Sequence, residues 1–576
     1  MKYKLIEGSD NNYENLQEMK INILKNRDVI NLDYLKLDSD KVGSKYENDY
    51  NRLDNINEAV KCLLKHVEND GRIFTVADCD VDGVCSFAEL YMYLKSTFPN
   101  LKIKYSIHTG KQHGLSDDIE VPKGTTLVIM TDGSSEDYEQ HKKLKEEGID
   151  VIVLDHHEAE KVSENAIVVN NQLCDYPNKQ LCGSAIVYKF LQALDDELWQ
   201  SKADEYIDLV ALGLIGDNMN VSEMETKYYI EKGLKHIRNK QFKALIEKQD
   251  YSMKGLVNMN NVAFYIAPLI NAMIRIGKQD EKKLLYQGFI QDYEEFDYKP
   301  RGNKPIEKED IYKRVARLCS NTKSRQDKMR DKQLKDIDEI ILTQNKNNDK
   351  IIIVDCEHKY HLGLTGVVAI KLADKYNKPC LLVNKSTDGL LRGSGRNTDR
   401  NEIKDLKDLL NKTGIAEGQG HKQAFGVSFK SEELNKLINI LNDKLKDVDF
   451  SANTYNVDYI IPFEDLQDEI VFEINLLKNL WGKGFEEPLI AIEDIEIEDK
   501  EIQVIGKNNN TLKFSIDGLD FIKFNVDSND KLIQNTSDWE SDENKTFKLN
   551  IVGKCSINDY NCVKTPQIIV QDYEII

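Results

Sequence analysis

Short β-rich apolar runs and apolar residues at helical spacing divide the chain into regions of different predicted structure. Short β-rich runs with helical patterns between them recur in the first third: RIFTVA (72–77), TTLVIM (125–130), DVIVLD (150–155) and AIVVNN (166–171). Strands that alternate with helices predict an α/β domain with a mainly parallel sheet. Between about residues 185 and 290, apolar residues at helical spacing predict a run of helices.

A second α/β unit is predicted further along the chain. KIIIVD (350–355) and CLLVN (380–384) are typical of strands, and GVVAIKLADKY between them is typical of a helix. After residue 448 short alternating strands with polar turns, such as LIAIEDIEI, TLKFSI and FKLNIVGKC, predict a small β-barrel. The predicted parts are an N-terminal extension packed on the core (1–70), an α/β domain (71–298), a basic helical connector (299–349), the second α/β domain (350–448) and the barrel (449–576).

Length and composition favour a multidomain protein that is not embedded in a membrane. The 576 residues allow two to four domains. No run of about 18 apolar residues occurs, and the first residues lack the apolar core of a secretory signal. The ten cysteines are scattered singly, which argues against a disulfide framework or a zinc ribbon. We therefore expect a cytoplasmic protein with reduced thiols and no membrane partner.

Charge restricts where a nucleic acid could bind. The net charge of -21 opposes non-specific binding, because phosphate contacts require lysine and arginine. Residues 299–335 are an exception, since thirteen Lys/Arg stand there against five Asp/Glu. By itself such a stretch is more often a solvated helix face. The functional interpretation is a helix that lines the groove between the two α/β units, with Arg314 and Arg317 contacting a strand.

Three carboxylates follow the first predicted strand, in the segment DCDVDG. In an extended chain Asp78, Asp80 and Asp82 would point to one side. Such crowding of like charge is unfavourable without a cation. An EF-hand loop does not fit, because the glycine comes too early, no glutamate closes the loop, and a strand precedes it. The segment therefore predicts a different kind of cation site.

Further acidic and imidazole groups follow other predicted elements. Asp132 comes after TTLVIM, Asp155-His156-His157 follow DVIVL, and Asp217 ends an apolar helical run. Either single Asp would more often be a turn or cap residue. Together they lie where ligands bind in parallel sheets, at the carboxyl ends of the strands. Many oxygen ligands with one or two imidazoles suit Mn²⁺ or Mg²⁺ better than Zn²⁺. Two such ions about 3.5–4 Å apart can support phosphodiester hydrolysis.

The order of these motifs resembles the DHH phosphoesterase superfamily. Longer segments resemble the RecJ single-strand-specific 5′→3′ DNA exonucleases: CGSAIVYKF (182–190), IAPLINAMIRIG (266–277), HLGLTGVVAIKLADKYNKP (361–379), GSGRN (393–397) and GQGHKQAFG (418–426). The resemblance implies that Asp80, Asp82, Asp132, His156 and Asp217 are ligands of two Mn²⁺ or Mg²⁺ ions, and that Asp78 is either a further ligand or a residue directly behind the ligands. It also implies that His157 contacts the scissile phosphate and that Asp155 orients the histidine.

The same resemblance implies domain roles and substrate contacts. Residues 71–298 would be the DHH catalytic domain, 350–448 the DHH-associated substrate-binding domain, and 449–576 an OB-fold-like nucleic-acid-binding domain. Arg275, Ser394 and Arg396 would hold phosphates near the 5′ end of the strand, next to glycine-rich turns. The full set of implied substrate contacts is Lys111, His113, Asn271, Arg275, Ser394, Gly395, Arg396, Gly420 and His421. Without the resemblance, the glycines would be interpreted as ordinary tight turns.

Some positions differ from the usual RecJ pattern or allow two interpretations. The segment HTGKQHGL (108–115) is shorter than the corresponding RecJ loop, and single-residue departures in GSGRN fit a phage or mobile-element version. In the barrel, Phe514, Phe521 and Phe524 could stack on bases or fill the core. These positions leave the substrate contacts open.

The predicted function is a single-strand-specific 5′→3′ DNA exonuclease that releases 5′ mononucleotides in DNA recombination, repair or replication. Its expected partners are single-stranded DNA, with RNA left open, and a single-stranded-DNA-binding protein or helicase. One alternative is a DHH nanoRNase or cyclic-dinucleotide phosphodiesterase, although such relatives are generally shorter. Another is a replication scaffold that has lost its metal, which is disfavoured because a carboxylate residue is present at every expected position of the metal motifs.

Overall fold

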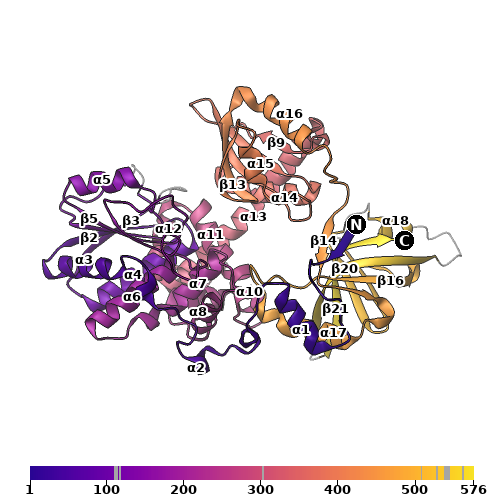
Figure 1. The fold of residues 1–576 in the computed structure, drawn as a ribbon, viewed down its shortest axis with the longest axis horizontal. Helices are drawn as coiled ribbons and strands as arrows, with labels where there is room; N and C mark the ends of the chain where they lie inside the picture. The colour runs from indigo at the N-terminus through magenta and orange to yellow at the C-terminus, as the bar shows by residue number, and fades with distance from the viewer. Residues whose placement is uncertain are drawn as a thin grey trace. The chain divides into compact units, whose positions relative to one another are not determined.

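The computed structural model divides the chain into two compact units (Figure 1). It describes residues 1–108, 114–115, 119–300, 302, 304–506, 509–526, 530–536, 545–560 and 563–576. One unit, here called the DHH unit, comprises Asn31–Gln326 and Asn479–Glu486. The other, here called the flanking unit, comprises Met1–Ile30, Asp327–Lys478 and Glu487–Ile576.

A parallel five-stranded sheet forms the centre of the DHH unit. Its order is β3-β2-β4-β5-β6, and each neighbouring pair is parallel. The strands are β2 (Arg72–Ala77), β3 (Lys102–Ile107), β4 (Leu127–Thr131), β5 (Asp150–Asp155) and β6 (Ile167–Asn170). The chain proceeds from β2 to β3 on one side and returns to β4 on the other, so the strand order reverses between β2 and β4. Ligands of open α/β sheets bind at the carboxyl ends of the strands at such a point.

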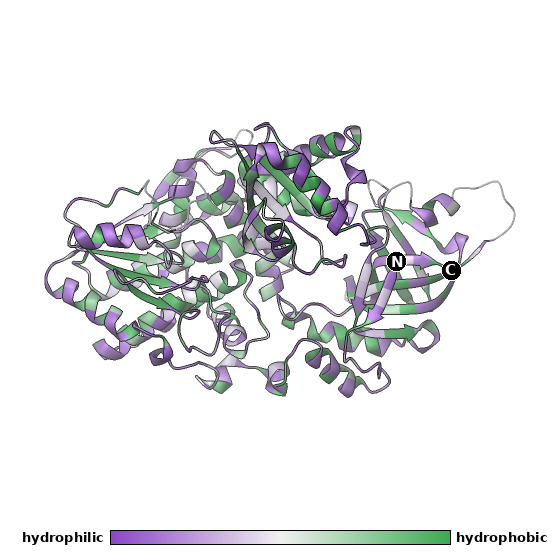
Figure 2. Cartoon of the chain, turned by 45° about the horizontal axis from the view of Figure 1, so that its top comes forward, coloured by the Kyte–Doolittle hydropathy of each residue, from purple (hydrophilic) through white to green (hydrophobic). Residues whose placement is uncertain are grey.

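Helices cover both faces of this sheet, which explains its continuous apolar strands. The helix α5 (Tyr138–Glu146) lies on one face, and α3 (Ile56–Glu68), α4 (Val81–Thr97) and α6 (Gly183–Leu198) lie on the other (Figure 1). Colouring by hydropathy shows apolar strands inside and polar outer faces of the helices (Figure 2). The expected α/β layout is therefore confirmed.

The predicted helical region follows the sheet. It contains α7 (Ile207–Gly216), α8 (Met224–Lys235), α9 (Lys240–Met253), α10 (Met259–Asn261), α11 (Ala267–Ile276) and α12 (Gln279–Phe289). A π-helical turn, Val262–Ile266, joins α10 to α11 without a break. The extensive packing of α7 against α4 and α8 buries nearly all of α7.

The basic stretch 299–335 is only partly helical, so the prediction of a helix over its whole length is wrong at the start. A hairpin of β7 (Glu295–Tyr298) and β8 (Glu307–Asp310) comes first, and α13 (Ile311–Thr343) follows it. Arg314 lies over the Phe296 ring, and Arg317 lies over the Tyr298 ring and pairs with Glu309. These contacts hold the hairpin against the helix, so the two arginines have a structural role that the charge pattern did not predict.

The second α/β domain has a mixed sheet with the order β12-β13-β11-β10-β9. Its elements are β9 (Ile352–Asp355), α14 (Thr365–Tyr376), β10 (Cys380–Lys385), β11 (Leu390–Arg396), α15 (Leu406–Asn411), β12 (Glu417–His421), β13 (Ala424–Lys430) and α16 (Leu434–Lys444). Apolar clusters fill both faces. The segment GSGRN lies mostly in β11, between β10 and β13, so the interpretation of its glycines as a turn is wrong. A Cβ at Gly393 would overlap the Leu382 carbonyl oxygen, which explains the glycine.

The C-terminal part contains a seven-stranded sheet with the order β15-β16-β20-β21-β19-β18-β17. Its elements are β14 (Thr454–Val457), β15 (Tyr459–Pro462), α17 (Asp468–Leu476), β16 (Ile490–Glu498), β17 (Gln503–Ile505), β18 (Thr511–Ile516), β19 (Leu519–Phe524), α18 (Lys531–Thr536), β20 (Thr546–Tyr560) and β21 (Val563–Ile575). Phe514 and Phe521 stack on each other in the interior, with ring centroids 4.9 Å apart. Phe524 is exposed. Core packing is thus the role of the first two.

The first 70 residues belong to both units. The strand β1 (Lys2–Leu5) pairs in parallel with β14, and α1 (Leu16–Lys25) leads to Arg27, which forms a buried ion pair with Asp458. In the DHH unit, α2 (Ser39–Val42) and α3 follow Tyr34, whose hydroxyl donates to the Val221 carbonyl. No helix in the described part of the chain is long and apolar enough to cross a membrane.

Candidate active site

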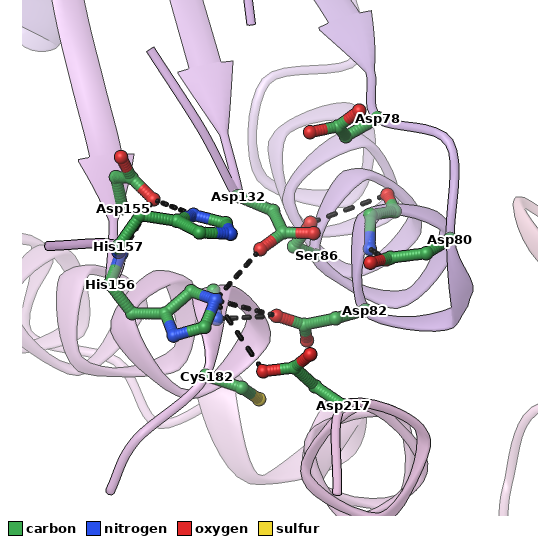
Figure 3. Close-up of polar contacts among 12 residues, drawn as sticks. Asp78, Asp80, Asp82, Ser86, Asp132, Asp155, His156, His157, Cys182 and Asp217 are labelled. Carbon is green, nitrogen blue, oxygen red and sulfur yellow. Dashed lines mark hydrogen bonds and ion pairs between the residues drawn. The ribbon is translucent and has the colours of Figure 1, made fainter. Parts of the chain in front are cut away.

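Three neighbouring strands of the DHH unit end in carboxylates. Asp78 follows β2, Asp132 follows β4, and Asp155 ends β5 (Figure 3). All three are buried. Asp132 has a φ of +59°, a left-handed backbone conformation that residues other than glycine rarely adopt. Rare backbone conformations of this kind are concentrated at functional sites.

The helix α4 brings a further carboxylate to the same edge. Asp80 is the N-cap of this helix and accepts a hydrogen bond from the Gly83 N–H at 2.8 Å. Because the helix begins at Val81, Asp82 lies in its first turn and not in the extended chain that the sequence pattern predicted. Helical geometry, and not strand alternation, therefore places Asp82 in the cluster.

Asp82 is held by the first turn of α6. It accepts hydrogen bonds from the backbone N–H groups of Gly183 at 2.5 Å and Ser184 at 3.0 Å. A Cβ at Gly183 would lie 2.6 Å from the Asp132 Cβ, and a Cβ at Gly213 would overlap Asp82 Oδ1. Glycine is required at both positions to let α6 and α7 approach the carboxylates. Gly183 lies in the segment CGSAIVYKF, but no local pattern in the sequence indicates that its backbone N–H binds a carboxylate.

One imidazole nitrogen faces three carboxylates. His156 Nε2 lies 3.2 Å from Asp132 Oδ1, 3.7 Å from Asp217 Oδ2 and 3.9 Å from Asp82 Oδ2 (Figure 3). Asp217 reaches this point as the C-cap of α7, as its position at a helix end suggested. Within the described residues, Asp132 Oδ1 and His156 Nε2 are buried and form no hydrogen bond. Such atoms fit a cation, which would satisfy them together.

The electrostatics of the cluster support the same conclusion. Burial, with the charges of Asp82 and Asp80, raises the pKa of Asp132 well above its usual range. The same causes raise the pKa of Asp217 to about 8. Burial also lowers the pKa of His156. Without positive charge, the cluster favours protonated carboxyl groups, so ionised oxygen ligands require a bound cation.

The second histidine, His157, is paired with the buried carboxylate of Asp155 (Figure 3). Its Nδ1 donates to Asp155 Oδ1 at 2.8 Å, and the side chain of His157 is about half exposed. Burial opposes the imidazolium, but the hydrogen bond to Asp155 raises the pKa of His157 to about 9. Asp155 also accepts from the backbone N–H groups of His156, His157 and Ser135. Asp155 is therefore suited to orient His157.

These residues also have the spacing of a metal site. Ligand atoms of Asp132, Asp155, His156 and His157 all lie within 4.8 Å of one another. Because the oxygens of Asp155 already accept several hydrogen bonds, we interpret it as a positioning group and not as a ligand.

Arg275 and Asn271 lie on α11 in the same unit. Arg275 is exposed and lies close enough to Asp80 for the carboxylate charge to act on its guanidinium. Asn271 lies one helical turn earlier and is partly exposed. The structure thus places Arg275 beside the acidic cluster.

In the flanking unit, the predicted phosphate-binding residues meet the start of α14. Ser394 Oγ lies 3.0 Å from Thr365 Oγ1, and Arg396 Nη2 lies 2.6 Å from the position of a Cβ at Gly366. Two hydroxyls, a guanidinium and a helix N-terminus therefore converge, which is a suitable site for a phosphate. Thr365 and Gly366 were not predicted as site residues, because their role depends on the packing of α14 against β11.

The remaining predicted contacts lie around this point or outside the described residues. Gly395 is buried in β11, where the Phe425 ring leaves no room for a side chain. Gly420 and His421 end β12 and are exposed. Lys111 and His113 lie outside the described residues.

Comparisons with known proteins agree with this arrangement. The family described as "DHH family, N-terminal domain" matches residues 72–214, and "RecJ OB domain" matches residues 457–572. A Bacillus subtilis protein named as the SPbeta prophage-derived single-strand DNA-specific exonuclease YorK is 37% identical over 100% of this chain and 98% of its own. The single-stranded-DNA-specific exonuclease RecJ of Bacillus subtilis is 26% identical over 89% of this chain and 63% of its own. The chain belongs to the RecJ family of DHH proteins.

Solved structures show the same fold. RecJ of Thermus thermophilus in complex with Mn²⁺ has a TM-score of 0.72 at 18% identity, covering 100% of this chain and 79% of that chain. The same RecJ in complex with Mg²⁺ has a TM-score of 0.68, also at 18% identity, and the match covers 99% of this chain and 78% of that chain. The predicted fold class, with its DHH and OB-type parts, is therefore confirmed.

Proposed function

We propose that this RecJ-family chain is a metal-dependent exonuclease that degrades single-stranded DNA from the 5′ end and releases 5′ mononucleotides. The observation that carries the proposal is the buried cluster in which His156 Nε2 faces Asp132, Asp217 and Asp82 at the reversal point of the sheet. The names of the relatives, which describe single-strand DNA-specific exonucleases, support the substrate class.

The residues of the cluster would have three roles: metal binding, contact with the scissile phosphate, and orientation of these groups. The proposed ligands of two Mn²⁺ or Mg²⁺ ions are Asp78, Asp80, Asp82, Asp132, His156 and Asp217. When bound, such ions would activate a water and stabilise the leaving oxygen. His157, protonated at neutral pH, would donate to an oxygen of the scissile phosphate, and Asp155 would hold its ring in place. The α6 hydrogen bonds to Asp82 would keep that carboxylate oriented.

Loss of a ligand tests the metal site. We expect Asp80→Ala, Asp132→Ala and His156→Ala to reduce hydrolysis by at least about two to three orders of magnitude, as the loss of a key electrostatic group does. The assay follows single-stranded DNA labelled at either end, with Mn²⁺, Mg²⁺ or EDTA. Glu158→Gln is the matched control, because Glu158 directly follows the histidines but is exposed. Turnover near the wild-type value by Asp132→Ala would contradict the assignment.

The direction of degradation would depend on recognition of the strand end. Ser394, Arg396 and the start of α14 at Thr365 and Gly366 would bind a 5′-phosphate, while Arg275 would bind a phosphate near the cluster. Removing a charged hydrogen-bond donor should raise KM about tenfold or more.

Substrates with and without a terminal phosphate test this pocket. Arg396→Ala should raise KM for 5′-phosphorylated DNA more than for 5′-hydroxyl DNA and leave kcat unchanged. Arg392→Ala is the control, since Arg392 lies on the same strand but is exposed and paired with Asp388. Equal effects of Arg396→Ala on both substrates, or release of label first from the 3′ end, would contradict the proposed polarity.

The biological setting forms part of the same proposal. A single-stranded-DNA-binding protein or a helicase would present the unpaired strand, and the OB-type part would add a second contact to it. The protein would act in the cytoplasm in DNA recombination, repair or replication.

A further inference from the structure

The helix that carries Arg275 also exposes an aromatic side chain with no role in the site described above. The side chain of Phe264 is 74% exposed, although its neighbours Val262 and Ile266 are fully buried. A single exposed apolar residue needs no explanation by itself. The backbone around Phe264, however, is unusual.

Phe264 lies in the π-helical turn between α10 and α11. The Ala267 N–H donates to the Val262 carbonyl, five residues earlier, as in a π-helix. Such turns are rare and occur frequently at functional sites. The neighbouring ring of Tyr265 contacts Phe264 edge to face, with centroids 5.1 Å apart. The π-turn therefore presents a braced aromatic ring to solvent.

The burial pattern places Phe264 and Arg275 on the exposed face of one continuous helical segment. They are eleven residues apart, which is about three helical turns or roughly 16 Å. Pro268 and Asn271 lie between them on this face and are partly exposed. The opposite face is buried, including Leu269, Ile270, Met273 and Ile274. One accessible face thus runs from the exposed ring to Arg275, next to the acidic cluster.

We propose that Phe264, braced by Tyr265, is a stacking platform for a base of the single-stranded substrate. This inference rests on the proposed function, in which Arg275 binds a backbone phosphate near the cluster. An exposed ring suits an unpaired base because every base has a flat face, so the contact depends little on sequence. The separation of roughly 16 Å corresponds to about three to five nucleotides at 3.4 Å or more per nucleotide.

The spacing predicts a dependence on strand length. Phe264→Ala should raise KM about 5- to 150-fold for a 20-nucleotide strand, as the loss of one stacked base does. It should leave kcat, and the hydrolysis of a dinucleotide, unchanged, because a dinucleotide bound at the cluster cannot reach the ring. Phe264→Trp should retain the KM of the wild type.

A control and a binding readout separate this inference from the proposed function. Trp199→Asn removes a ring that is 95% exposed, at a left-handed position that Asn tolerates, and should change nothing. In an inactive Asp132→Asn background, the added tryptophan of Phe264→Trp should be quenched when the 20-nucleotide strand binds, relative to Asp132→Asn alone. Absence of this quenching, or equal effects of Phe264→Ala on long and short substrates, would overturn the platform. Absence of hydrolysis by the wild type would instead overturn the proposed function, because the quenching does not depend on hydrolysis.

Discussion

Replacing Asp132 by Asn should stabilise the protein without metal and destabilise it relative to wild type with metal. Asn has the same size but no charge, and Asp132 is buried beside Asp82, Asp80 and Asp78. Removing a buried carboxylate that lacks compensation should add about 1–3 kcal/mol to the free energy of unfolding. At about 2 °C per kcal/mol for a unit of this size, Tm in EDTA should rise by about 2–6 °C.

The sign of the pH dependence follows from the raised pKa of Asp132. The folded state binds the proton more tightly than the unfolded chain, so the wild type loses stability as pH rises towards the folded pKa. The advantage of Asp132→Asn in EDTA should therefore be small near pH 4 and should grow towards neutral pH. Thermal unfolding across this pH range, with EDTA present throughout, measures the trend.

With Mn²⁺ present, the wild type should have a higher Tm than Asp132→Asn. At 100 times its Kd, Mn²⁺ should stabilise the wild type by about 2.7 kcal/mol, which is about 5 °C here. Asp132→Asn should gain little, because it has lost a ligand. The same titration by scanning calorimetry, with and without Mn²⁺, gives both values. Two results would refute the assignment of Asp132 as a ligand. One is an equal rise in Tm on adding Mn²⁺ to the two proteins, and the other is a Tm in EDTA that is lower for Asp132→Asn than for the wild type.

Three further substitutions test the packing around the site and between the chain ends. Arg27→Met should lower the free energy of unfolding of the flanking unit by about 3–5 kcal/mol in urea titrations, because it leaves Asp458 as an uncompensated buried charge; a loss below about 1 kcal/mol would contradict this. Glu89→Leu should raise Tm in thermal scans, since this carboxyl is fully buried and forms no hydrogen bond with the described residues. A lower Tm would show that Glu89 has a partner. Gly183→Ala should lower kcat at least about tenfold while the far-ultraviolet circular dichroism stays unchanged, because its Cβ would meet the Asp132 Cβ at 2.6 Å; wild-type kcat would contradict the close approach.

The positions of Asp78, Asp132 and Asp155 could be predicted from the sequence for a simple reason. Each directly follows or ends a strong apolar run, and parallel strands bring their carboxyl ends to one edge. Local pattern and a general rule of topology are sufficient in this case. Asp217 required the resemblance, because a helix end does not by itself indicate where the helix packs.

Contacts between distant segments could not be predicted in the same way. Gly183 binds Asp82, and Thr365 contacts Ser394, only because α6 packs against α4 and α14 packs against β11. Neither contact produces a periodic signal. Likewise, the glycines of GSGRN locally suggest a turn, but they lie in a strand. Gly393 is needed there because the backbone of β10 packs too closely against it to leave room for a side chain. Tertiary packing outweighed local preference at these positions.

The pairing of β1 with β14 affects how the protein is made. The two strands are about 450 residues apart, so the ribosome produces β1 long before its partner. At about 5–20 residues per second, β1 would wait roughly 20–90 s for β14 to be synthesised. The DHH unit contains only residues 31–326 and 479–486, so most of it can fold during this interval. The flanking unit, in contrast, can pair β1 with β14 only once residue 457 has been synthesised, and until then β1 is exposed to chaperones and proteases.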